Sequence, residues 1–254
     1  MLPIPLRQAI KRRLPISLLR WYKRRKWEPI RQHYGALPVA DCFSEIYRTK
    51  RWGEAEDEDF CSGEGSGAYF AVPYVKQVQR LIAEHQIRSI VDLGCGDFRV
   101  GRLIRAQCNL PYVGVDVVPD LIAHNRSRFG GPQVEFRCAN VIDDELPDGE
   151  LCLIREVLQH LTNAEILRVL AKCAKYRLVL VTEELFTKRG SRPNLDITHG
   201  PDNRASDNSG VFLDLPPFSF RTTSVLEIPF PQDETVLRTI LVEGLTKAKP
   251  KLSG

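Results

Sequence analysis

Short apolar segments alternate with helix-like segments between residues 87 and 183, and this alternation constrains the fold more than any other feature of the sequence. The apolar runs have the length of buried strands, and the segments between them carry apolar residues at helical spacing. The expected strands cover residues 87–93, 112–116, 134–137, 151–155 and 177–183, and the helices between them residues 99–107, 119–129 and 164–174. Because helical crossovers join parallel strands, the sequence predicts a doubly wound α/β sheet.

Segments on either side of this region complete the expected domain. A helix is expected over residues 69–86, and two strand-like runs at 224–229 and 235–242 predict a hairpin. The predicted fold is a seven-stranded, mostly parallel sheet with a C-terminal antiparallel hairpin. The expected domains are a basic amphipathic helical extension at 1–34, an irregular connector with a Gly-rich end at 35–68, and a Rossmann-like domain at 69–247. In the extension, a helix break is expected near Pro15 and a helix end near Pro29.

Composition favours a cytoplasmic globular protein. Hydrophobic residues make up 43% and charged residues 27% of the chain, and no apolar run reaches the roughly 18 residues of a membrane-spanning helix. The seven cysteines form no C-x-x-C pair and no zinc-type spacing. They are expected to be free thiols in a reducing compartment.

The segment 89–98, SIVDLGCGDF, predicts a nucleotide-type ligand at the end of the first strand. Gly94 and Gly96 allow the backbone to approach a ligand closely. A dinucleotide fingerprint would need a third glycine at position 99, which is Arg99, and no P-loop lysine follows. Asp92 would repel a pyrophosphate but tolerates a cation, which favours the sulfonium and ammonium of S-adenosylmethionine.

Three later segments are consistent with the same ligand. Asp116 ends the second strand, 20 residues after Gly96, where its carboxylate suits the two ribose hydroxyls. In the segment 138–142, CANVI, Asn140 has two interpretations: a hydrogen bond to the adenine edge, or the end of a strand. The segment 154–161, IREVLQHL, brings His160 beneath the expected cofactor, where a packed histidine and a catalytic one are equally consistent with the pattern.

These segments, in this order, resemble the successive motifs of class I S-adenosylmethionine-dependent methyltransferases over about residues 90–245. Four further short motifs resemble an uncharacterised bacterial branch of that superfamily: IY at 46–47, WG at 52–53, SGEGS at 62–66 and PPF at 216–218. The sequence departs from the common pattern at Phe98, after Asp97, where a third glycine often occurs; this leaves the start of the next helix open. The resemblance implies that Asp92, Gly94 and Gly96 line the methionine portion of the cofactor and that Asp116 binds its ribose. It also implies that Asn140 and Val141 lie at the adenine, and that Glu156 and His160 lie near the reaction centre. The candidate cofactor-binding residues are Asp92, Gly94, Cys95, Gly96, Asp116, Val117, Asn140, Val141 and Glu156.

The polar segment 187–220 is expected to build the acceptor site, because a long connection in a compact domain is often functional. His160, Asp196 and His199 are the candidate catalytic residues. The sequence lacks the Asn-Pro-Pro-aromatic signature frequent in N-methylating enzymes, and no acidic cluster has metal-ligand spacing. We therefore expect metal-free O-methylation, and by analogy a sugar hydroxyl on a lipid-linked glycan. The alternatives are an RNA or small-metabolite methyltransferase, a non-catalytic cofactor-binding module, and an NAD-dependent oxidoreductase.

Residues 1–34 carry ten Lys or Arg against one acid, a net charge of +9, so the other residues carry 4 − 9 = −5. Trp21, Tyr22 and Trp27 interleave with the basic residues. Three interpretations stay open: contact with the anionic inner face of a membrane, contact with nucleic acid phosphates, and docking on the domain itself.

Overall fold

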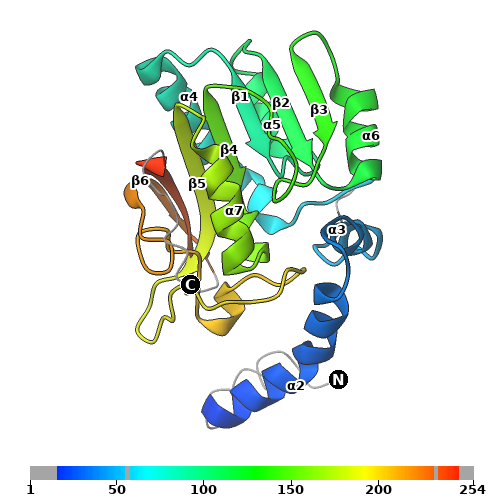
Figure 1. Ribbon diagram of the computed structural model, residues 1–254, viewed down its shortest axis with the longest axis vertical. Helices are drawn as coiled ribbons and strands as arrows, with labels where there is room; N and C mark the ends of the chain where they lie inside the picture. Colours follow the sequence, from blue (N-terminus) through cyan, green and yellow to red (C-terminus); the bar gives the residue numbers. More distant parts are fainter. Residues whose placement is uncertain (1–15, 55–57, 232–233, 246–254) are drawn as a thin grey trace, which may run out of the picture.

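The computed structural model in Figure 1 describes residues 16–54, 58–231 and 234–245, with side chains from residue 25 onward except Lys26. Within these ranges, seven strands form one sheet in the order β3-β2-β1-β4-β5-β7-β6. The first five are parallel to one another, and β7 runs antiparallel to both β5 and β6. The strands are β1 (Ile90–Leu93), β2 (Tyr112–Asp116), β3 (Val134–Cys138), β4 (Leu151–Arg155), β5 (Leu178–Phe186), β6 (Arg221–Pro229) and β7 (Thr235–Glu243). The predicted fold class is confirmed.

Helices cover both faces of the sheet, as the alternation predicts. On one face, α4 (Ala68–His85), α5 (Arg99–Arg105) and α6 (Pro119–Phe129) pack against residues such as Ile90. On the other face, α7 (Asn163–Cys173) packs against residues such as Val91, together with Leu213 and Phe218 from the segment before β6. Because every side chain of β1 is buried, its sequence is an apolar run rather than an alternating pattern.

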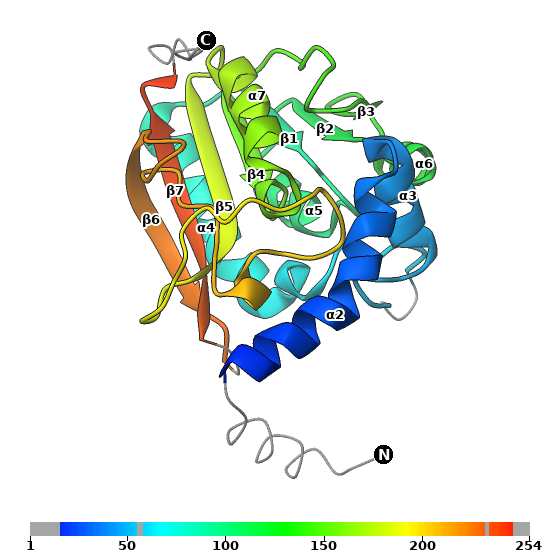
Figure 2. The same ribbon diagram turned by 60° about the horizontal axis from the view of Figure 1, so that its bottom comes forward.

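Two further helices lie beyond the carboxyl ends of the parallel strands (Figures 1 and 2). They are α2 (Ile16–Gly35) and α3 (Val39–Arg48). The expected helix end near Pro29 is wrong, because α2 continues through Pro29 to Gly35. Proline removes one backbone hydrogen bond, but Ile30 and Tyr34 beyond it pack against Ile46 of α3. The earlier helical piece and the break near Pro15 lie outside the described residues.

The connector at 35–68 is also not irregular throughout, since it contains α3. Cys42 and Ile46 lie four residues apart on the buried face of this helix, which is helical spacing that the sequence interpretation missed. The helices are attached to the segment after β5: Trp52 Nε1 donates to the Pro201 carbonyl over 3.0 Å. Arg31 forms ion pairs with Asp202 and Asp207 at 3.1 and 2.6 Å.

One boundary difference affects the functional site. Strand β5 reaches Phe186 rather than residue 183, because its pairing with β7 continues to Phe186 opposite Thr235. This extension carries Glu183 and Glu184 beyond the point where the pairing of β4 with β5 ends.

Candidate active site

A cavity of about 720 Å³ lies at the carboxyl ends of β1, β2 and β4. One end is lined by the turns that follow these strands. The other end is lined by side chains of α3, the end of β5 and the segment 201–208. This is the edge at which doubly wound sheets bind ligands.

The glycine turn after β1 has a backbone geometry that favours glycine. Gly94 and Gly96 have φ values of 76° and 53°, in the left-handed region. A Cβ at Gly94 would lie 2.3 Å from Val157 Cγ2, and one at Gly96 would lie 2.4 Å from Ser62 Oγ. The turn therefore needs glycine for close packing as well as for its backbone conformation. Both glycines and Cys95 line the cavity.

Phe98 does not disturb the start of the following helix. It adopts φ 60° immediately before α5, which begins at Arg99. Its ring is buried and packs edge-on against Phe136, and a Cβ at Gly101 would lie 2.4 Å from that ring. The phenylalanine fills the space left by Gly101.

Two buried carboxylates, Asp92 and Asp116, line the cavity, each only 8% exposed. Asp116 Oδ2 accepts the Gly96 N–H at 3.0 Å, and Oδ1 accepts the Val118 N–H at 3.2 Å. A carboxylate has about four lone-pair sites, so backbone N–H groups leave Asp116 capacity for a ribose hydroxyl. Asp92 accepts the hydroxyl of Tyr112. Burial raises the pKa of Asp92 to about 6 and also raises the pKa of Asp116.

This set of groups fits S-adenosylmethionine. Buried carboxylates whose charged form is disfavoured gain from a nearby cation or from hydroxyl donors, and the cofactor brings a sulfonium, an ammonium and two ribose hydroxyls. Val117, Asn140 and Val141 also line the cavity, as expected for ribose and adenine contacts. Asn140, however, holds the turn after β3: its Oδ1 accepts the Ile142 N–H at 2.9 Å.

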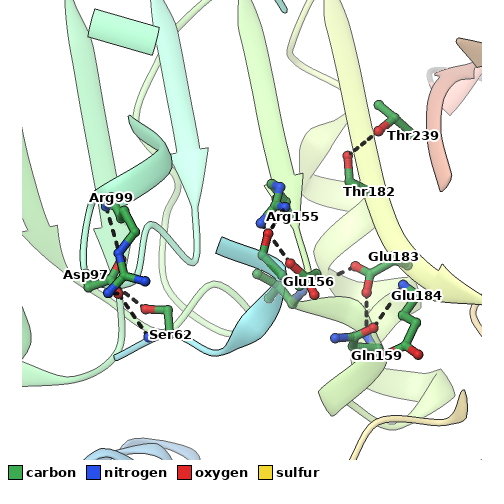
Figure 3. A network of polar contacts seen from close by, with 12 residues as sticks. Ser62, Asp97, Arg99, Arg155, Glu156, Gln159, Thr182, Glu183, Glu184 and Thr239 are labelled. Carbon is green, nitrogen blue, oxygen red and sulfur yellow. Dashed lines mark hydrogen bonds and ion pairs between the residues drawn. The ribbon is translucent and has the colours of Figure 1, made fainter. Parts of the chain in front are cut away.

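The turn after β4 is held in place by Glu183 of β5 (Figure 3). The Glu183 carboxylate accepts the N–H groups of Val157, Leu158 and Gln159 at 3.3, 2.9 and 3.1 Å. Glu156, just before them, is a non-glycine residue with φ 55°, and its carboxylate lines the cavity. A strained residue held by its surroundings is frequent at active sites.

His160 also lines the cavity, as predicted. Its Nδ1 lies 3.2 Å from the Asp202 carbonyl oxygen, so Nδ1 carries the proton and Nε2 has the free electron pair. The ring packs against Trp52 with centroids 5.1 Å apart. Burial lowers the pKa of His160 to about 4, so the imidazole is neutral at neutral pH.

This depressed pKa predicts acid sensitivity. His160 binds a proton near pH 6.5 in the unfolded chain but only near pH 4 in the folded chain. The contribution of the neutral His160 to the free energy of unfolding is therefore complete above pH 6.5 and declines as the pH falls to 4. Between pH 7 and 5 we expect His160 to account for a loss of about 2 kcal/mol of unfolding free energy. Urea unfolding of the wild type and His160→Gln at both pH values measures it. Equal losses in the two proteins would contradict this prediction.

The other two candidate catalytic residues, Asp196 and His199, do not line the cavity. His199 lies between the Glu165 carboxylate and the Leu37 carbonyl, each at 3.0 Å, and connects α7 to the segment between α2 and α3. Asp196 Oδ1 accepts the N–H of Asn163, the first residue of α7, at 2.8 Å. Their polar atoms serve the fold, and this placement does not support the catalytic roles expected for them.

Other residues reach the cavity that the sequence interpretation did not select. Three of them are aromatic residues from α3 and the segment that follows it, and three are polar residues from the segment after β5. Part of the segment 187–220 therefore borders the cavity, as expected. These residues are Phe43, Tyr47, Trp52, Asn203, Ser206 and Asn208. The Trp-Gly pair at 52–53 was noted only as a family feature, and no local pattern indicated that this segment folds over the sheet edge.

Comparison with known proteins agrees with this geometry. Residues 90–177 match the family model described as a methyltransferase domain. No curated protein sequence matches the chain. The N-methyltransferase NodS from Bradyrhizobium japonicum WM9, solved with S-adenosyl-L-homocysteine, is similar in fold, with 11% identity and a TM-score of 0.54 over 78% of this chain and 99% of that one.

A second similar structure is the 1,6-didemethyltoxoflavin-N1-methyltransferase of Burkholderia thailandensis, solved with 1,6-didemethyltoxoflavin and S-adenosylhomocysteine. It is 17% identical, with a TM-score of 0.51 over 84% of this chain and 90% of that one. Residues 90–177 therefore carry a methyltransferase domain, and the two solved structures show that the chain has the fold of class I methyltransferases, as the motifs predict. The cavity described above fits S-adenosylmethionine as the cofactor. The narrower bacterial branch stays a prediction.

Proposed function

We propose that this methyltransferase methylates a sugar hydroxyl of a glycan. The observation that carries the proposal is the chemistry of the acceptor end of the cavity, which combines aromatic faces with neutral and acidic hydrogen-bonding groups. Trp52, Phe186 and Phe230 line the cavity, and so do Asn203 and Glu184. Aromatic faces pack against the C–H faces of sugars, while amide and carboxylate groups bind hydroxyls and fix orientation.

Charge favours a neutral acceptor over RNA. Among the described residues that line the cavity, Arg155 is the only Lys or Arg, and it is paired with Glu156 over 2.7 Å. Nucleic acid binding depends on Lys and Arg contacts to phosphates. The remaining charged lining residues are carboxylates, which would repel a phosphate near the reaction centre.

The reaction is an in-line substitution in which the acceptor oxygen bonds to the methyl carbon as the carbon–sulfur bond breaks. The cofactor supplies a methyl group on a positively charged sulfur. Holding the hydroxyl in line can lower the barrier by roughly 7–11 kcal/mol. We assign the proton to His160 Nε2, whose only hydrogen-bond contact within the described part of the chain, to Gln159 Nε2, is long at 3.5 Å. A neutral imidazole suffices as acceptor because the hydroxyl becomes acidic as the new bond forms.

The test is release of S-adenosylhomocysteine with a panel of neutral glycans, RNA and anionic metabolites. We expect turnover with a neutral glycan, and a KM at least about 10-fold higher in Asn203→Ala, which removes a hydrogen-bonding group from the acceptor end. Asn109→Ala, far from the cavity, is the matched control. Turnover with RNA alone would reject the sugar acceptor, and no turnover with any acceptor would favour a non-catalytic binding module.

We also propose that the basic N-terminal segment contacts an anionic membrane, which would bring the enzyme to a lipid-linked acceptor. Support comes from the charge of residues 1–34. None of the described helices is long and apolar enough to span a membrane. Replacing the seven Lys and Arg residues of positions 1–24 with Gln leaves Arg31 and its ion pairs intact. We expect this variant to lose co-sedimentation with anionic vesicles, and unchanged co-sedimentation would reject the membrane contact.

A further inference from the structure

Arg155 is a buried cation in the cavity whose hydrogen-bonding capacity is mostly unused. It ends β4, is 8% exposed at its side chain, and lines the cavity. One Nη donates to Glu156 Oε2 at 2.7 Å and the other donates to the Gly65 carbonyl (Figure 3). A guanidinium has five N–H groups, so three are left over. The buried Nε has no hydrogen-bond partner among the described residues.

An unpartnered N–H of a buried cation is costly, and Arg155 is the one such arginine among the described residues that lines the cavity, where a ligand that accepts hydrogen bonds would lower this cost. The guanidinium also lies over the ring of Tyr74, 5.2 Å from its centroid, which fixes its plane. A planar fork held in this way matches a carboxylate better than it matches a hydroxyl or an amine.

The surroundings of Arg155 match the two charges of an amino acid. Arg155 and Asp92 lie on the adjacent strands β4 and β1, and both line the cavity. Burial raises the pKa of Asp92, and the positive charge of Arg155 acts in the opposite direction. The methionine portion of the cofactor is a zwitterion. Its ammonium suits the Asp92 side and its carboxylate suits the Arg155 side.

We propose that Arg155 binds the carboxylate of the methionine portion of S-adenosylmethionine and thereby selects the intact amino-acid end of the cofactor. This inference rests on the function assigned above. Gly65 is part of the same site: a Cβ there would lie 2.1 Å from Glu156 Oε2, so this glycine is needed for the Arg155–Glu156 pair to form.

The experiment compares two ligands in calorimetry: S-adenosylhomocysteine and its decarboxylated counterpart, which keeps the adenosine, sulfur and amine. For the wild type we expect the carboxylate-bearing ligand to bind about 10- to 100-fold more tightly, the range for a charge-assisted hydrogen bond. Arg155→Gln should remove most of this preference, while its affinity for the decarboxylated ligand changes little. Arg155→Lys should retain part of it.

Arg99→Gln is the matched control, because Arg99 is also paired with a neighbouring carboxylate, Asp97 at 3.5 Å, but does not line the cavity. It should keep the wild-type preference. Equal weakening of both ligands in Arg155→Gln would show a merely structural role and overturn the proposal. Equal affinity of the wild type for both ligands would also overturn the proposal, and this comparison does not depend on whether Arg155→Gln folds. Absence of binding of either ligand would instead reject the function itself.

Discussion

Asp116→Ala is expected to weaken binding of S-adenosylhomocysteine by about 1–3 kcal/mol, or roughly 5- to 150-fold in Kd. The substitution removes both carboxylate oxygens of a residue that lines the cavity, and with them the acceptor capacity that remains beside the bonds to backbone N–H groups. It also frees the Gly96 N–H that Asp116 holds. Calorimetric titration of the two proteins, at a temperature where both are folded, measures the change.

Asp120→Ala is the control for Asp116→Ala. Asp120 lies four residues after Asp116, in the first turn of α6, is exposed, and does not line the cavity. Its loss should leave the affinity unchanged, whereas Asp116→Asn, which keeps one acceptor oxygen, should be intermediate. An affinity of Asp116→Ala equal to that of the wild type would show that the ribose assignment is wrong.

Arg204→Met is expected to give the largest loss of stability, about 3–5 kcal/mol, because it removes the charged donor of three hydrogen bonds at a fully buried position. Arg204 is 0% exposed and donates to the carbonyls of Leu161 and Leu195 at 2.5 and 2.7 Å. A third bond goes to Asn163 Oδ1 at 2.7 Å. The substitution leaves these acceptors, one in a buried and two in part-buried hydrogen bonds, without their donor. Thermal unfolding should show a Tm lower by roughly 6–20 °C.

The control for Arg204→Met is Arg192→Met in the same segment, since Arg192 is exposed and makes one long bond of 3.4 Å to the Asp207 carbonyl. Its Tm should change by no more than about 2 °C, as for most surface substitutions. A wild-type Tm in Arg204→Met would mean that this guanidinium does not hold the segment between β5 and β6 in place.

Local patterns predicted the sheet and the cofactor end of the cavity. The strands are apolar runs because the parallel strands are buried on both faces, as the burial of all four residues of β1 shows. Gly94, Gly96 and Asp116 were found from the sequence because a turn at a strand end imposes a local backbone and spacing requirement. Their assignment to particular parts of the cofactor stays a prediction.

The acceptor end depends on contacts between distant segments, and local patterns do not specify these. Trp52 reaches the cavity because its indole bonds to Pro201, 149 positions away. Asp196 and His199 have the residue types of a catalytic pair, but the helix start at Asn163 and the carboxylate of Glu165 occupy them. Composition predicted a polar segment here but did not indicate which of its side chains face inward.

Titration of the wild-type protein with S-adenosylhomocysteine, and separately with NAD, tests the central claim most directly. The two buried carboxylates beside the glycine turn should favour the adenosyl amino acid and repel a pyrophosphate. We therefore expect saturable binding of S-adenosylhomocysteine at one site per chain and no measurable binding of NAD. Binding of NAD without binding of S-adenosylhomocysteine would contradict the account.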